Sequence, residues 1–224
     1  MASIPISGST NCKPAREYFK RAAKTFAGYD TSEHPITVDT ELWIDEYISF
    51  CPMSEQLNMG LYVSHLWNTP MLGYTVPPDC EVRGGEASFS GDTKRRNWHL
   101  DVVITNSRKF KIPETPVRNV LTNHQKNGTT WIVYRAIVSQ PCEKVSASQR
   151  VYNCTLNIAS YGHSMAHLDL RWNEKAPLIH IGSRHKTHFN ITDFHTTRTE
   201  QQYPIGRFAE LGVTFVVKAA ERHS

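Results

Sequence analysis

The feature that most constrains the fold is the segment Arg150 to Ile158, in which apolar Tyr152, Cys154, Leu156 and Ile158 alternate with polar Asn153, Thr155 and Asn157. A period of two places alternate side chains on opposite faces of an extended chain, so this segment predicts a strand with one buried face. Thr130 to Ser139 is rich in β-branched and aromatic residues and apolar on both faces, which predicts a central strand. The C-terminal half is therefore expected to form a sheet.

Further strand-like segments follow the same logic. They are residues 36–50, Trp98 to Thr105, His167 to Trp172, Leu178 to Ile181 and Gly212 to Ala219. The chain shows no alternation of strands with helices and no glycine-rich phosphate loop, which argues against a parallel α/β sheet. A mostly antiparallel sheet is expected.

Three segments favour helices. Pro14 to Tyr29 carries apolar residues at helical spacing beside a basic face. Ser54 to Trp67 places Leu57, Leu61 and His65 on one line, and Thr115-Pro116 begins a third segment that ends at Asn127-Gly128. The predicted fold class is α+β: a mostly antiparallel sheet with two to three helices packed on one face, plus an N-terminal helical arm.

The predicted domain organisation has two parts. Residues 1–30 form a lead and a basic amphipathic helix, and residues 31–224 form a single α+β domain with a long loop at 68–96. The loop is predicted from its density of proline and glycine, which interrupt regular structure.

Composition and cysteine usage favour an intracellular protein. The hydrophobic fraction is 39% and the charged fraction 21%, as in an ordinary folded chain. Neither a signal-like N-terminus nor a run of about 18 apolar residues is present. Five cysteines without a CxxC pair favour buried free thiols, and the sequons at Asn127, Asn153 and Asn190 are interpreted as accidental.

Catalytic patterns are missing from the sequence. Six histidines fall between His163 and His195, but the HExxH pattern is absent and the spacing does not bring them together in an extended chain. GxSxG and cofactor fingerprints are also absent. The protein is predicted to be no enzyme, with no metal, no cofactor and no small-molecule substrate.

A mild excess of basic residues, with a formal net charge of +4, is compatible with an anionic partner. Two groups of positive charge are interpreted as contacts for lipid or nucleoprotein. The predicted contact residues are Arg16, Lys20, Arg21, Lys24, Lys94, Arg95, Arg96, Lys109 and Lys111. The cluster at 94–96 also resembles a minimal nuclear import signal.

The stretch NWHLDVVITNSRKFKIPETPVRNVLTNHQKNGTTWIVYRAIV, residues 97–138, resembles the core of rhabdovirus matrix proteins. In that family a strand leads through a polar turn into a helix and then into a strand with an aromatic residue near its start. The corresponding parts here are Leu100 to Thr105, Lys109 to Pro113, Pro116 to His124, Asn127 to Thr130 and Trp131 to Val138. The PPxY budding motif is missing, so the plant-infecting subgroup fits better.

The resemblance implies a viral structural protein that self-associates, condenses nucleoprotein-RNA and bridges it to an anionic membrane during budding. Its implied location is the virion, the host cytoplasm and the membrane periphery, with entry into the nucleus in some members. Two alternatives stay open. One is a plant-virus movement or capsid-type nucleic-acid-binding protein, and the other is a metal-dependent hydrolase that uses the histidines from His163 to His195.

Overall fold

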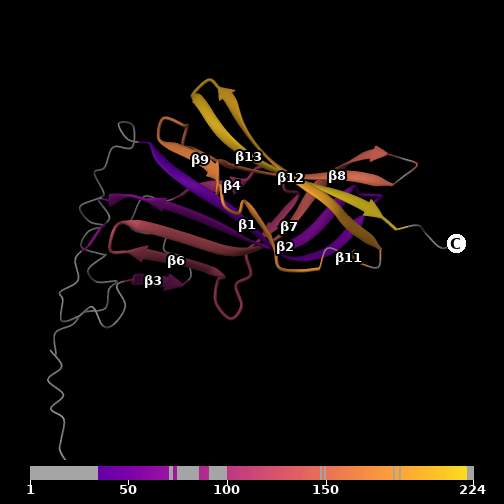
Figure 1. The fold of residues 1–224 in the computed structure, drawn as a ribbon, viewed down its shortest axis with the longest axis horizontal. Helices are drawn as coiled ribbons and strands as arrows, with labels where there is room; N and C mark the ends of the chain where they lie inside the picture. The colour runs from indigo at the N-terminus through magenta and orange to yellow at the C-terminus, as the bar shows by residue number, and fades with distance from the viewer. Residues whose placement is uncertain are drawn as a thin grey trace, which may run out of the picture.

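A computed structural model describes residues 35–70, 73–74, 86–90, 100–146, 148, 150–183, 185–186 and 188–220. Within these ranges the chain forms strands and turns and no α-helix. Figure 1 shows long, twisted strands stacked in two layers. The α+β prediction is therefore wrong, and the described part is an all-β sandwich.

Thirteen strands make up the described part. Their bounds are β1 Ile36–Cys51, β2 Gln56–Asn68, β3 Glu86–Ser90, β4 Val102–Ile104, β5 Lys109–Lys111, β6 Val120–Gln125, β7 Thr129–Ser146, β8 Val151–Ser160, β9 Leu168–Trp172, β10 Leu178–His180, β11 His185–Lys186, β12 Phe189–Tyr203 and β13 Gly206–Ala219.

One hydrogen-bonded path connects the two layers, in the order β10-β1-β2-β7-β8-β13-β12-β11. Strand β7 pairs with β2 up to Pro141 and with β8 from Cys142 onward, so a single strand passes from one layer to the other. Strand β1 pairs in parallel with β9 and β10, whereas the other pairs in the described part are antiparallel.

The core lies between the layers and consists of alternate residues of the long strands. Leu42, Leu61, Leu156, Leu211 and Phe215 are among the fully buried side chains. They come from β1, β2, β8 and β13, whose apolar residues recur at a period of two. The predicted strands at 36–50, 130–139, 150–158, 167–172, 178–181 and 212–219 coincide with observed strands, so these predictions are confirmed.

The predicted helix at Ser54 to Trp67 is wrong, since β2 occupies the segment. Leu57, Leu61 and His65 are four residues apart, and four is both close to a helical turn and a multiple of two. Met59 and Val63 lie between them on the same face and are equally buried. A period of two explains all five positions, whereas a helix would place Met59 on the opposite side.

The predicted helix that begins at Thr115-Pro116 is also wrong. Strand β6 covers its second half and is joined to β7 by a turn at Asn127-Gly128. Gly128 has φ 87°, a left-handed conformation that suits glycine and that a hairpin turn demands. The Asn127-Gly128 turn, which was predicted to end a helix, is therefore the turn of a β-hairpin.

The predicted N-terminal helix lies outside the described residues. Within the predicted loop at 68–96 the described residues include strand β3, which pairs with β6. The division into an arm and one domain stays a prediction.

The expectation of free thiols is wrong for two cysteines. Cys142 on β7 and Cys154 on β8 are directly paired across the two strands and form a disulfide. Cys51 is free and exposed, while Cys12 and Cys80 lie outside the described residues. The pairing depends on a register between strands that cysteine spacing does not reveal.

Candidate functional site

The segment that follows β8 is held by one carboxylate, Asp101. Its Oδ1 accepts a hydrogen bond from Ser160 Oγ at 2.6 Å, and its Oδ2 accepts one from the Gly162 backbone N–H at 2.6 Å. Its carbonyl oxygen accepts the Tyr161 N–H, and His163 Nδ1 lies 3.1 Å from Oδ1. These contacts fix the path of residues 160–163 immediately beyond the strand.

The environment of Asp101 favours its charged form. Partial burial raises the pKa of this carboxyl group, but hydrogen bonds from Ser160, His163 and Gly162 outweigh that effect and hold the pKa below its usual value. A carboxylate that is charged at neutral pH is therefore the anchor of the segment.

Residues 161–167, here called the β8–β9 segment, contact the hairpin formed by β12 and β13. The Met165 N–H donates to the Arg207 carbonyl oxygen at 2.7 Å. Gly206 has φ 135°, and a Cβ at this position would lie 3.1 Å from Ser164 Cβ. Glycine at position 206 thus permits both the turn of the hairpin and its close approach to the segment.

Large apolar and aromatic side chains are exposed on both of these elements. Tyr161 in the β8–β9 segment is 83% exposed, and Tyr203 and Ile205 in the hairpin are 52% and 76% exposed. The Tyr203 ring meets the buried Phe208 edge to face, with centroids 5.5 Å apart. Because exposed aromatic rings on adjoining elements mark binding surfaces, we define Tyr161, Tyr203 and Ile205 as the aromatic patch.

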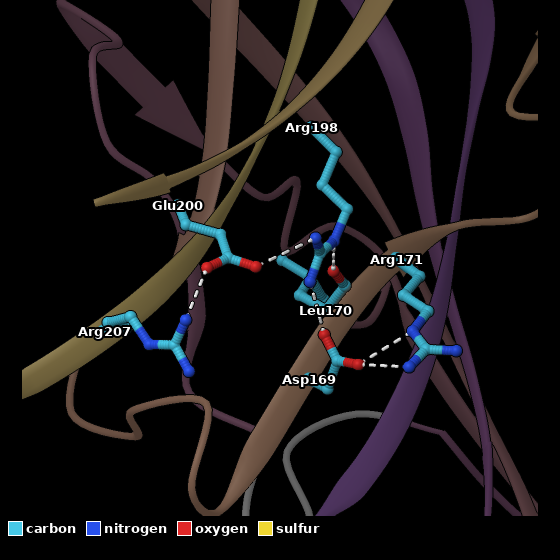
Figure 2. Close-up of polar contacts among 6 residues, drawn as sticks. All are labelled: Asp169, Leu170, Arg171, Arg198, Glu200 and Arg207. Atoms are coloured by element: carbon cyan, nitrogen blue, oxygen red, sulfur yellow. Dashed lines mark hydrogen bonds and ion pairs between the residues drawn. The ribbon is translucent and has the colours of Figure 1, made fainter. Parts of the chain in front are cut away.

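An ion network connects the hairpin to β9, as Figure 2 shows. Asp169 accepts from Arg198 Nη2 at 2.7 Å through one oxygen and from Arg171 Nε at 2.8 Å through the other. Glu200 extends the network, since its Oε1 lies 3.5 Å from Arg198 Nη1 and its Oε2 lies 3.2 Å from Arg207 Nη1. The network ends on the residue whose carbonyl oxygen binds the β8–β9 segment.

Two hydrogen bonds to backbone reinforce this connection. Arg198 Nε donates to the Leu170 carbonyl oxygen at 3.1 Å, and Trp172 Nε1 donates to the Thr197 carbonyl oxygen at 2.8 Å. Strand β9 pairs with β1, whereas β12 pairs with β13 in the other layer. The network therefore ties β9 of one layer to β12 of the other.

This arrangement can bind but has no groups placed for catalysis or metal coordination in the described part. No group of three or more His, Cys, Asp or Glu side chains there could hold a metal ion. The rings of Tyr161 and Tyr203 offer π faces, and an organic cation is attracted to such faces. Such rings can contact a ligand that is partly apolar or positively charged.

The nine predicted contact residues are spread over the chain, and the structure describes two of them. Lys109 and Lys111 are exposed on β5, on either side of Phe110. The others, Arg16, Lys20, Arg21, Lys24, Lys94, Arg95 and Arg96, lie outside the described residues. That the nine form a contact surface stays a prediction.

Among the described residues, the histidines between His163 and His195 do not converge on one point. His163 and His167 lie in the β8–β9 segment with ring centroids 6.5 Å apart. His180 is half-buried and contacts Tyr47, whose hydroxyl is 3.0 Å from its Nδ1, while His195 is exposed on β12. A strand distributes neighbouring histidines over two faces, so density along the sequence does not produce a cluster.

Sequence reasoning missed the aromatic patch. Tyr161 follows a predicted strand, yet nothing local relates it to Tyr203, which is 42 positions away. A usable signal was the Tyr203-Pro-Ile-Gly206 run, where turn residues are flanked by extended segments and predict a hairpin. Recognition of that hairpin would have placed Tyr203 beside its turn.

The fold and the patch together define a β-sandwich binding domain. Residues 20–206 match the family model for the neurotransmitter-gated ion-channel ligand binding domain. Because the match covers most of the chain, the chain belongs to this family.

Several curated relatives come from Caenorhabditis elegans. The chain is 27% identical over 186 residues to the acetylcholine-gated chloride channel subunit acc-1, covering 82% of this chain and 39% of the relative. It is 25% identical to the subunit acc-2, covering 82% and 41%, and 24% identical to the serotonin-gated chloride channel mod-1, covering 84% and 38%. The chain therefore spans about two fifths of the length of these relatives.

Family membership overturns the functional interpretation based on residues 97–138. The viral matrix protein, the movement or capsid protein and the histidine-dependent hydrolase are all wrong. In the structure the stretch that resembled a strand, a helix and a strand contains β4, β5, β6 and the first part of β7. The prediction that the protein is not an enzyme is confirmed, since the family is one of ligand-binding domains.

The predicted partners and location are corrected as well. The predicted partners are wrong, because the family is a ligand-binding domain of neurotransmitter-gated channels. Those partners were viral nucleoprotein-RNA, an anionic membrane surface and further copies of the chain, with no small molecule. A virion, host cytoplasm or nucleus is likewise wrong for a relative of ion-channel subunits. In the described part no helix is long and apolar enough to cross a bilayer.

Proposed function

We propose that this chain is the extracellular ligand-binding domain of a neurotransmitter-gated chloride channel subunit and that its ligand is a small organic cation. The contact between the β8–β9 segment and the β12–β13 hairpin carries the proposal, because it brings Tyr161 and Tyr203 onto adjoining elements. Acetylcholine and serotonin, which gate the channels acc-1 and mod-1, are both organic cations of this size.

The aromatic patch suits such a ligand. A cation over the face of a tyrosine gains about 0.5 to 1 kcal/mol at an exposed site and about 2 kcal/mol where bound ligand excludes water. Asp169 and Glu200 place two negative charges among the three guanidinium groups of Arg171, Arg198 and Arg207, which they partly compensate. The repulsion of a cation by these guanidinium groups is thereby reduced.

The disulfide supports an extracellular domain. Bonds such as Cys142–Cys154 form and persist in oxidising compartments and are rare in the cytosol. The pair lies at the point where β7 leaves β2 and joins β8, which is the connection between the layers. An oxidising environment would thus stabilise the fold on which the patch depends.

Isothermal titration calorimetry on the full chain tests the proposal, with acetylcholine, serotonin and γ-aminobutyric acid in separate titrations. The last is included because a γ-aminobutyric acid receptor subunit is also a relative. We expect one of the two cations to bind, and Tyr161→Ala or Tyr203→Ala to raise its Kd about 2- to 30-fold.

Conservative variants provide the control for this experiment. Tyr161→Phe and Tyr203→Phe keep the π face and should retain binding, whereas Phe110→Ala removes an exposed ring on β5, away from the patch, and should change nothing. Binding that survives both alanine substitutions, or that is confined to γ-aminobutyric acid, would refute the proposed ligand class.

A further inference from the structure

Three N-glycosylation sequons become candidate modification sites if the domain is extracellular. The inference drawn from them rests on that part of the proposed function. Asn127-Gly-Thr129, Asn153-Cys-Thr155 and Asn190-Ile-Thr192 each satisfy the acceptor pattern for an N-linked glycan. Their interpretation as accidental depends on the predicted intracellular location, since glycans need a secretory route. The structure separates the three by their surroundings.

Asn127 lies in the turn between β6 and β7, and its side chain is exposed. Its Oδ1 accepts the Thr129 N–H at 3.0 Å, and its Nδ2, the atom that receives a glycan, makes no hydrogen bond to any described residue. Thr129 Oγ1 accepts from Asn68 Nδ2 at 2.9 Å, so the threonine hydroxyl hydrogen is still available for donation. Both functional atoms of this sequon are accessible.

Space beside the turn is also available. Asn68, Thr69 and Thr129 line a surface groove of about 500 Å³ together with the start of β1. The Gly128 carbonyl oxygen accepts the Thr69 N–H at 3.1 Å, which fixes the turn against the groove. A first sugar on Asn127 would extend over an open surface without displacing a strand.

The other two sequons lie inside strands. Asn153 is half-buried on β8 between β7 and β13, and the middle residue of its sequon is the disulfide-bonded Cys154. Asn190 is exposed, but it sits on β12 between β11 and β13, and Thr192 Oγ1 donates to the Val216 carbonyl oxygen at 3.2 Å. Acceptor sequons are expected on surface loops, where Asn127 alone of the three is found.

We therefore infer that Asn127 is an N-glycosylation site. In the transfer, Nδ2 forms a bond to the anomeric carbon of an oligosaccharide carried on a lipid pyrophosphate. The bond between that carbon and the phosphate oxygen breaks, the lipid pyrophosphate leaves with the electron pair, and Nδ2 loses one proton. The product is a β6–β7 turn that carries a sugar chain at the edge of the groove.

The test directs the full chain into the endoplasmic reticulum of cultured eukaryotic cells and compares its mobility before and after peptide N-glycosidase F. Mass spectrometry after deglycosylation in ¹⁸O-labelled water identifies the occupied asparagine. Asn127→Asp keeps an oxygen for the Thr129 N–H but has no Nδ2, so it should lose one discrete mobility step. Thr129→Ala should lose the same step, whereas Thr129→Ser preserves the sequon and should retain it.

Two readouts on the same material separate this inference from the proposed function. Unmodified Asn127 in a protein that has formed Cys142–Cys154 and binds a cationic ligand overturns the glycosylation site alone. Glycosylated Asn127 in a protein that binds none of the three tested ligands supports the site and overturns the proposed ligand. Glycans on Asn153 or Asn190 with Asn127 empty would also contradict the inference.

Discussion

Arg198 on β12 binds Asp169 on β9 at 2.7 Å, and this pair joins the two layers of the sandwich. The Asp169 side chain is 14% exposed and the Arg198 side chain 32% exposed, so the pair is partly shielded from water. The position of the hairpin that carries Tyr203 therefore depends on charges that the other layer supplies.

Arg198→Ala should lower the free energy of unfolding by about 1 to 2 kcal/mol, since it removes a charge-assisted hydrogen bond that is only partly exposed. Arg198→Lys should be intermediate, because an ammonium group cannot reproduce the two guanidinium contacts to Asp169 and the Leu170 carbonyl oxygen. Urea denaturation measures both. Arg171→Ala is the matched control, and an equal loss there would show that joining the layers contributes nothing.

The pKa of Asp101 predicts a loss of stability in acid. Its pKa in the folded protein lies below the usual value of about 4, so the unfolded chain takes up the proton first as pH falls. The contribution of Asp101 is therefore complete above about pH 5 and is lost as pH falls through the folded pKa. Asp101→Asn should be less stable than the parent at pH 7, and the difference should shrink as pH falls below the usual carboxyl pKa, as measured by thermal unfolding.

His65 predicts a second loss of stability in acid, which begins at a higher pH than the loss due to Asp101. Burial lowers the pKa of this histidine to about 3, and its Nδ1 is 3.0 Å from Thr40 Oγ1 in the core. Because the unfolded chain binds the proton below about pH 6.5, unfolding becomes easier by up to about 1.4 kcal/mol for each further pH unit. Burial lowers the pKa of His124 to about 4, which adds to the same slope.

His65→Gln removes this titration while keeping a polar group beside Thr40. The free energy of unfolding of the variant, measured in urea between pH 7 and pH 5, should depend less steeply on pH than that of the parent. An unchanged slope would mean that His65 is protonated in the folded state. His195→Gln, an exposed histidine on β12, is the matched control and should leave the slope as it is.

Removal of the disulfide should cost about 2 to 4 kcal/mol of stability. The bond between Cys142 and Cys154 closes a loop with a sequence separation of 12, which restricts the unfolded chain. The double variant Cys142→Ser, Cys154→Ser should unfold at lower urea concentration, and reductant should have the same effect on the parent. Cys51→Ser, at an exposed free thiol, should change nothing. A stable reduced protein would contradict the expectation.

Local patterns were sufficient for many of the strands. Alternation in residues 150–158 predicts both the strand and its buried face, because Tyr152, Cys154, Leu156 and Ile158 are all buried. The same logic failed at Ser54 to Trp67, where apolar residues four positions apart fit both the helical period of 3.6 and the strand period of two. It also failed at Asn127-Gly128, where a hairpin turn has the same residues as the end of a helix.

By itself the sequence determined which segments extend and which of their faces are apolar, since these depend on neighbours along the chain. The tertiary structure decided which distant residues meet. The pairing of Cys142 with Cys154, the reach of Arg198 to Asp169 and the approach of Gly206 to Ser164 all follow from strand register and from the stacking of two layers. Register and stacking are set by the whole core at once, so no single segment encodes them.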